Sequence, residues 1–149
     1  MNNGSLPGTL VINSTVTFSE NGSNEPESAV SGNNGGGDGD LDECVGIKLQ
    51  RGVGTDQANA EANFTYLLGS ASYYVPFSGL EAVLDAQSVG VTANGGNDTV
   101  VYKLSCNIAN DIKKAGADGI FSTADDIDVN ENIIQSDRAQ INITFTLNQ

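Results

Sequence analysis

The clearest pattern of hydrophobic and polar positions lies towards the C-terminal end of the chain. In the stretch AQINITFTL, Ile141, Ile143, Phe145 and Leu147 alternate with polar residues. Successive side chains of a β-strand point to opposite faces, so this period of two predicts a strand with one buried and one solvated face. TLVINSTVTF, residues 9–18, follows the same alternation and predicts a second such strand near the start of the chain.

Further short runs are rich in β-branched and aromatic residues and are separated by turn-forming Gly, Asn and Ser. They are CVGIKLQ, NFTYLL, SYYVPF, SVGVTA and TVVYKLSC. The sequence NGGND at 94–98 is typical of the turn of a β-hairpin. Many short strands with little helix predict an all-β fold: one β-sandwich domain, of jelly-roll or Greek-key type, over residues 1–149.

One segment departs from the period of two. In SGLEAVLDAQ, residues 78–87, three apolar residues fall on one helical face, and Ser78 and Glu81 have the spacing of a capping box. We therefore predict one short helix here. A further turn or two of helix is predicted in GTDQANAEAN, residues 54–63.

Residues 20–43 separate the N-terminal strand, within residues 1–19, from the rest of the chain. This segment is rich in glycine and carries seven acidic residues and no basic one. It buries too little apolar surface to offset the entropy of ordering it, so we expect a linker or long loop. A strand on such a tether can pair in its own sheet or reach a neighbouring subunit, and we favour pairing within the domain.

The end of this segment, GDGDLDE, also alternates acidic residues as an EF-hand does. Asp38, Asp40 and Asp42 stand at alternate positions, but Glu43 and Leu49 occupy the places that need Gly and Glu. A flexible acidic linker is the better interpretation of these residues.

The charge of the chain is strongly lopsided. Nineteen acidic and six basic residues give a net charge of −13 at pH 7. Such a surface repels phosphate backbones and anionic lipid, which excludes nucleic acid as a direct partner. No apolar run reaches transmembrane length and residues 1–10 show no signal-peptide pattern, so we expect no membrane insertion of this chain.

Two cysteines, Cys44 and Cys106, stand in a chain without histidine and without a CxxC motif. Zinc sites and Cys-His nucleophiles therefore lack the residues they need. We expect one disulfide between the two cysteines, the alternative being a pair of buried free thiols.

Asn-x-Ser/Thr sequons are unusually frequent in this chain. Six occur, at Asn3, Asn13, Asn21, Asn63, Asn97 and Asn142. Asn142 lies inside a predicted strand, and the candidate glycosylation sites are Asn13, Asn21, Asn63 and Asn97. Together with the expected disulfide, they indicate an extracellular or cell-surface glycoprotein.

The stretch GADGIFSTADDIDVNEN, residues 116–132, concentrates acidic residues with no Lys or Arg among them. Carboxylates gathered in one loop repel each other, and a hard divalent cation relieves the repulsion. Ca²⁺ takes carboxylate, carbonyl and water oxygens in a forgiving geometry, whereas Mg²⁺ demands near-octahedral ligands. We expect a Ca²⁺ site here, the alternative being a solvated acidic turn with locally capping Asp residues.

Within this stretch, DGIFSTADD at 118–126 resembles the DGxxxTxDD calcium loop of prokaryotic surface proteins and of pilin-like and type II secretion pseudopilin subunits. The resemblance covers about a dozen residues, and the long apolar helix with which pilins begin is missing from this sequence. It implies carboxylate ligands at three Asp residues, with neighbouring carbonyls assisting. With the adjacent Asp128, the candidate metal ligands are Asp118, Ile120, Thr123, Asp125, Asp126 and Asp128.

The sequence contains no recognisable catalytic motif. GxSxG, P-loop and HExxH patterns are missing, no histidine is available as a general base, and the acids cluster in loops. We therefore expect no enzyme. The favoured hypothesis is a calcium-stabilised structural subunit of an extracellular filament or pilus-like surface assembly, which self-associates by strand addition.

The alternative hypothesis is a calcium-dependent adhesin or carbohydrate-binding module. A stacking platform for a sugar would then come from four aromatic residues, Tyr66, Tyr73, Tyr74 and Phe77. Ordinary core and edge packing is the competing interpretation of these aromatic residues.

Overall fold

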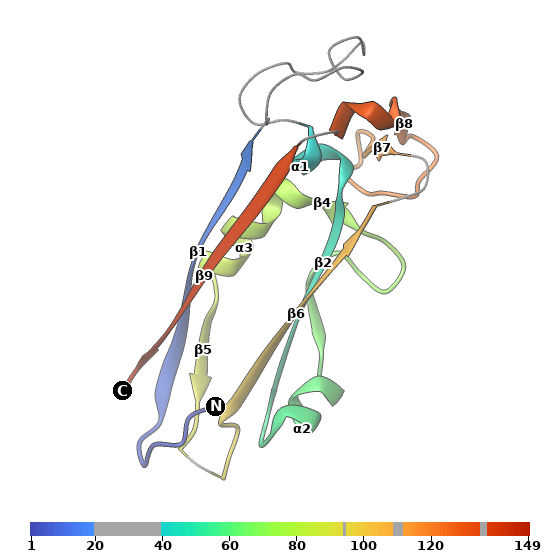
Figure 1. The fold of residues 1–149 in the computed structure, drawn as a ribbon. Coiled ribbons are helices and arrows are strands. Elements are labelled where there is room, and N and C mark those ends of the chain that lie inside the picture. Colours follow the sequence, from blue (N-terminus) through green and yellow to red (C-terminus); the bar gives the residue numbers. More distant parts are fainter. Residues whose placement is uncertain (20–39, 94, 109–111, 135–136) are drawn as a thin grey trace.

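The computed structural model describes residues 1–19, 40–93, 95–108, 112–134 and 137–149. Its strands form two antiparallel sheets that face each other, with a small two-stranded sheet at one end (Figure 1). The predicted all-β, sandwich-like fold is confirmed. None of the described helices is long and apolar enough to span a bilayer.

The first sheet has the strand order β5 (Ser88–Val91), β1 (Gly8–Ser19) and β9 (Arg138–Asn148). β1 and β9 are the two strands predicted from alternation, and they pair antiparallel from Thr9↔Asn148 to Ser19↔Arg138. β1 is therefore the middle strand of a sheet within its own chain, as expected from the favoured interpretation.

The second sheet is built around β2 (Gly46–Gly54). β6 (Thr99–Asn107) pairs with β2 along one edge. β3 (Thr65–Leu68) and β4 (Val75–Pro76) share the other edge. The two long strands β2 and β6 thus face the β1–β9 pair of the first sheet.

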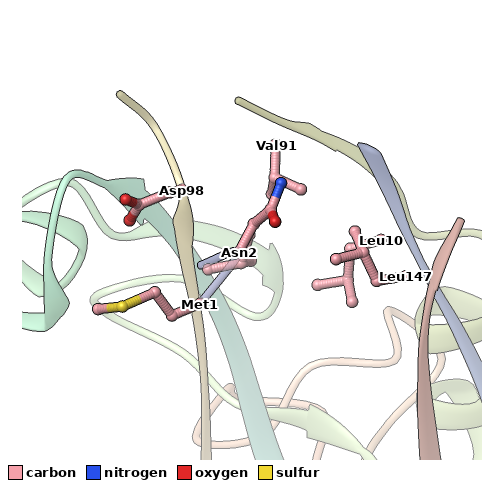
Figure 2. A pocket seen from close by; sticks show the side chains of 7 residues that line it. Met1, Asn2, Leu10, Val91, Asp98 and Leu147 are labelled. Carbon is pink, nitrogen blue, oxygen red and sulfur yellow. The ribbon is translucent and has the colours of Figure 1, made fainter. Parts of the chain in front are cut away.

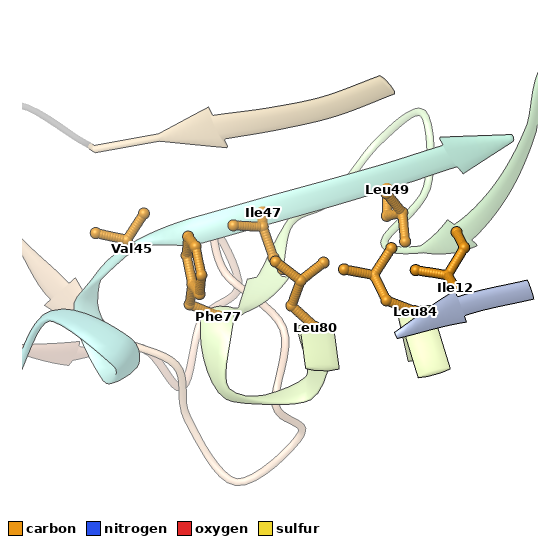
Figure 3. Close-up of a cluster of buried hydrophobic side chains, with 7 residues drawn as sticks. All are labelled: Ile12, Val45, Ile47, Leu49, Phe77, Leu80 and Leu84. Carbon is orange, nitrogen blue, oxygen red and sulfur yellow. The ribbon is translucent and has the colours of Figure 1, made fainter. Parts of the chain in front are cut away.

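The main core lies between the sheets and is completed by a helix. α3 (Leu80–Asp85), which follows the 3₁₀ turn η2 (Phe77–Gly79), packs against β1. α3 closes one long side of the sandwich (Figures 1 and 3). The buried side chains of this core are Ile12, Val45, Ile47, Leu49, Phe77, Leu80 and Leu84.

Both predicted helices are confirmed, but the predicted capping box is wrong. α2 (Gln57–Ala62) is capped by Asp56, whose carboxylate accepts from Asn59 N–H at 2.8 Å. α3 begins after Gly79 with no side-chain cap. Glu81 instead accepts a hydrogen bond from the backbone of β1.

The hairpin predicted at NGGND is also wrong. β5 pairs with β1 in the first sheet, whereas β6 pairs with β2 in the second, so residues 92–98 cross between the sheets. Local turn residues specify that the chain reverses here, but they do not specify the sheet to which the next strand belongs.

A second, smaller cluster caps the end of the sandwich opposite the chain termini (Figure 1). It combines α1 (Leu41–Cys44), β7 (Lys113–Lys114), β8 (Ile127–Asp128) and the 3₁₀ turn η3 (Glu131–Ile134). Its buried residues are Cys44, Ile112 and Ile133.

The two cysteines are not bonded to each other. Cys44 is buried in this small cluster, Cys106 is exposed on β6, and both thiols are free, so the predicted disulfide is not formed. Burial raises the pKa of the Cys44 thiol to about 12.

The predicted linker, residues 20–43, falls mostly outside the described residues. Its described end is not a linker: residues 41–43 belong to α1, and Asp40 is fully buried. The EF-hand alternation and the flexible-linker interpretation are therefore both wrong for Asp40, while Asp38 lies outside the described residues.

Candidate functional site

The acidic loop connects β7 to β8, and its centre is the hydroxyl of Thr123. Thr123 Oγ1 lies 2.8 Å from Asp125 Oδ1, 3.2 Å from Asp126 Oδ1 and 3.1 Å from the carbonyl oxygen of Ile120. Two carboxylates and one carbonyl of the predicted ligand set are thus brought together around one side chain. The hydrogen bond from Thr123 lowers the pKa of Asp125.

Asp118 belongs to the same loop, whereas Asp128 does not join it. Asp118 N–H donates to Asp125 Oδ2 at 3.3 Å, and Asp118 Oδ1 accepts from Ile120 N–H at 2.9 Å. Asp128 pairs with Lys113 at 2.9 Å on the small sheet. Among the described residues, no three acidic, Cys or His side chains converge closely enough to hold a metal ion in this conformation.

Two residues fix the path of this loop. A side chain at Gly116 would collide with Asp125, because a Cβ there would lie 2.3 Å from Asp125 Oδ2. Phe121 is 8% exposed, and its N–H donates to the carbonyl of Tyr74 at 3.0 Å. Phe121 was not among the predicted site residues, although one aromatic residue in a run of small and acidic residues is a signal of an anchor.

A buried ion pair holds the same end of the molecule together. Lys114 Nζ lies 2.7 Å from Asp40 Oδ1 and 2.5 Å from Glu43 Oε2, and the Asp40 side chain has no exposed area. Burial alone would lower the pKa of Lys114, but its hydrogen bonds to Asp40 and Glu43 raise it above the ordinary value. Asp40 N–H also donates to Asp137 Oδ2, so the cluster ties α1, β7 and the start of β9 together.

The aromatic platform of the adhesin hypothesis is not assembled. Phe77 is buried and stacks edge-on against Phe18 in the core. The ammonium group of Lys48 lies 4.0 Å from the ring centroid of Tyr74. Tyr66, on β3, is exposed. Phe77 therefore serves core packing and cannot join a surface platform, and the ring of Tyr74 is engaged by Lys48.

A small cavity lies at the end of the sandwich that carries both termini (Figure 2). Its volume is about 80 Å³, and Leu10, Val91 and Leu147 contribute to its walls. The buried Asn2 bonds to the carbonyls of Leu6 and Thr92 beside it. Sites for small organic ligands are typically several hundred Å³ in volume. This cavity is therefore a packing gap at an end of the sandwich that the N-terminal residues cover.

The sequons lie at exposed positions wherever the structure describes them. Asn13, Asn63 and Asn97 are exposed, as are Asn3 and Asn142, while Asn21 lies outside the described residues. Asn13 faces Thr144 and Thr15 faces Asn142 in the β1–β9 register. These two Asn–Thr pairs lie on the outer face of the first sheet and give both sequons a structural role as cross-strand pairs.

The edge of β1 that faces β5 is protected at residues 8–11, Ser14 and Val16. β5 covers residues 8–11. Beyond them, Ser14 N–H donates to Asp85 Oδ1 at 2.7 Å and Val16 N–H donates to Glu81 Oε2 at 2.8 Å. Two carboxylates of α3 thus replace a strand where β5 ends.

The outer edge of β9 has no such protection. β9 is the last strand of its sheet, and no described element pairs with its outer side. Its inward-facing apolar side chains remain open to solvent at this side: Ile143 is 40%, Phe145 53% and Leu147 38% exposed. We call the outer backbone of Arg138–Asn148 together with these three side chains the β9 edge.

The hydrogen bonds of β1 determine which backbone groups of β9 point outwards. Ser14 and Val16 direct their N–H groups to α3, away from β9, so their partners Ile143 and Ile141 form non-hydrogen-bonded pairs with them. In such pairs, both backbones turn away from each other. By the same alternation, the residues of β9 with outward N–H and C=O groups are Ala139, Ile141, Ile143, Phe145 and Leu147.

Comparison with known proteins adds no relative, since no family model, no curated protein and no solved structure matches this chain.

Proposed function

We propose that this protein is a structural subunit of an extracellular filament or surface assembly and that it self-associates by strand addition at the β9 edge. The observation that carries the proposal is the exposure of three large apolar side chains beside the outer edge of an eleven-residue strand, an edge with which no described strand pairs. Unpaired strand edges are templates for pairing with another chain, and an added strand would cover both the backbone and the side chains.

The contrast between the two edges of the first sheet favours function over accident. Stable monomeric proteins blunt their sheet edges with charges, prolines, bulges or covering elements. The α3 side follows this rule, because Asp85 and Glu81 occupy the free N–H groups of β1. The β9 edge carries no proline and no covering element among the described residues, and its one charged residue, Arg138, stands at the first position of the strand.

Calcium binding at the acidic loop is part of the same proposal. Asp125, Asp126 and the Ile120 carbonyl already lie around Thr123, and Asp118 of the same loop would add a third carboxylate if it turned away from Ile120 N–H. Oxygen ligands of this kind suit Ca²⁺. Bound calcium would stabilise the end cap of a subunit that works outside the cell.

Assembly is tested with two variants that add the same charge to the same sheet. Phe145→Lys places an ammonium group on the β9 edge, and Thr15→Lys places one on the solvated outer face of β1. We expect light scattering and electron microscopy to show assembly of the wild type and of Thr15→Lys, but not of Phe145→Lys. A wild type that stays monomeric at all concentrations, with and without calcium, would contradict the proposal.

The calcium site is tested by calorimetry on the wild type, on Asp125→Ala and on the control Asp128→Ala. We expect binding in the wild type and the control and a loss of binding in Asp125→Ala, because Asp128 is engaged with Lys113. Bound Ca²⁺ should also raise the melting temperature by mass action. Absence of binding to the wild type would remove calcium from the proposal without affecting strand addition.

A further inference from the structure

We propose that the partner of the β9 edge is β9 of a second copy, paired antiparallel about a two-fold axis that passes through Thr144. The inference rests on the proposed function, in that it names the partner and register for the self-association surface. It joins the first sheets of two copies into one continuous sheet with the order β5-β1-β9-β9-β1-β5. This two-fold contact alone builds a closed dimer, and a filament would need a second contact between such dimers.

The lengths of the free edges limit the choice of partner strand. Among the described strands, β3, β4 and β5 have at most four residues, whereas β9 has eleven and β6 has nine. β1 is paired with β9 along one edge, and β5 and α3 cover the other edge at residues 8–11, Ser14 and Val16. Only β9 and β6 of a second copy therefore match the length of the β9 edge.

Burial of apolar surface favours β9 over β6. The inward side chains of β6 that pack on the core, Tyr102 and Leu104, are already half-buried, and Tyr102 contacts Phe145 of its own chain at a ring distance of 6.1 Å. A contact between two β9 strands instead brings together the exposed side chains of both copies. Each partner then covers what the other leaves open.

The direction of the backbone groups restricts the register. The outward N–H and C=O groups of β9 belong to odd-numbered residues, so in a two-fold pair each odd-numbered residue must face another. An axis through Thr144 places Phe145 opposite the second copy's Ile143, and Leu147 opposite its Ile141. An axis through Ile143 would place Leu147 opposite Ala139 and would leave more apolar surface exposed.

Charge permits this contact despite the acidity of the chain. Arg138–Asn148 contains one arginine and no acidic residue, in a chain with a net charge of −13. The repulsion between copies therefore arises away from the strand pair.

The expected interface is small, which decides the experiment. With the axis at Thr144, nine residues of each β9 strand, 140–148, face the second copy. They give about 31 Å of strand edge, and a sandwich about 10 Å thick would bury roughly 300 Å² per copy. Stable interfaces bury about 800 Å² per partner, so the isolated pair should be weak and dependent on concentration. A covalent trap is more informative than a stability measurement.

The trap is the substitution Thr144→Cys, which adds one cysteine on the proposed axis. It is made in the full chain with Cys106→Ser, which removes the exposed native thiol and leaves only the buried Cys44. Thr144 would face Thr144 of the second copy in a non-hydrogen-bonded pair. The Cα atoms of such a pair are about 4.5 Å apart, a distance that suits a disulfide. Asn142→Cys and Thr146→Cys are the controls, because each cysteine would lie about 14 Å from the same position in the second copy. Mild oxidation should convert Thr144→Cys to a covalent dimer at least tenfold faster than either control.

The outcomes separate this inference from the proposed function. If the wild type assembles but Asn142→Cys or Thr146→Cys crosslinks fastest, the axis is wrong. If it assembles and none of the three crosslinks faster than the Cys106→Ser background, the partner strand is wrong, and β6 of a second copy or a different protein is indicated. If the wild type shows no self-association, and Thr144→Cys does not crosslink, the proposed function fails as well.

Discussion

At the scale of single residues, the Asp40–Lys114 pair is the feature whose loss should cost most. Removing the ammonium group in Lys114→Met leaves the fully buried carboxylate of Asp40 without its cation. Breaking a buried pair on one side typically costs about 3 kcal/mol or more. We expect this loss in the free energy of unfolding, measured by urea denaturation.

Lys113→Met is the matched control. Lys113 is the neighbour of Lys114 on β7, and it pairs with the exposed Asp128 of β8. Exposed pairs contribute at most about 1 kcal/mol. Equal effects of the two substitutions would contradict the role assigned to Lys114. The double variant Asp40→Asn with Lys114→Met should recover part of the lost stability, because the only carboxylate that then lacks Lys114 is that of Glu43, whose side chain is half-exposed to solvent.

Thr123 sets the acid response of the loop. Its hydroxyl lowers the pKa of Asp125 below the ordinary Asp value of about 3.9. A carboxylate with a lowered pKa contributes stability above its unfolded pKa and loses it as the pH falls through the folded pKa. In Thr123→Val, we expect a shallower decrease of the urea midpoint below pH 4, whereas Thr123→Ser should behave like the wild type.

Residue-level prediction from the sequence was limited by what alternation and spacing encode. Ile12 and Ile141 were placed on the inner face correctly, because period two determines the side of a strand. The burial of Asp40 was not predictable from its acidic, glycine-rich surroundings. It depends on Lys114, which lies 74 positions away in the sequence.

At the scale of elements, α3 acts as a substitute strand. Its carboxylates at Glu81 and Asp85 accept the N–H groups that β5 is too short to reach. Asp85→Ala should therefore destabilise the domain by about 1–2 kcal/mol and make β1 prone to non-specific pairing. Asp85→Asn keeps an acceptor and should lose less; urea denaturation and light scattering measure the two effects.

The element predictions that failed share one cause. The helix α3 was predictable from its apolar face, but its capping box is not formed. The carboxylate of Glu81 accepts a hydrogen bond from Val16 N–H at the edge of β1 instead. The turn at 94–98 was visible, but β5 and β6 separate into different sheets. In both cases, local sequence determined the element, and a contact distant in sequence determined its partner.

At the scale of the whole molecule, the two long sides of the sandwich differ. α3 closes the side at β1 (Figure 1). On the opposite side, between β9 and β6, the ring of Phe145 contacts the ring of Tyr102. The alternation of β9 predicted a strand with a solvated face and a buried face. It did not predict that the buried face would remain partly open, since this depends on which elements cover the edge.

This asymmetry and the net charge together predict how self-association depends on salt. Two copies with a charge of −13 each repel at long range, although their β9 strands carry no acidic residue. The Debye length shortens from about 30 Å at 0.01 M to about 8 Å at 0.15 M ionic strength, so added salt screens the repulsion while the apolar contact remains. Sedimentation velocity should therefore show a dimer fraction that rises with NaCl for the wild type and stays near zero for Phe145→Lys. A dimer that dissociates as salt is added would indicate contacts between opposite charges and would contradict an apolar, acid-free interface at β9.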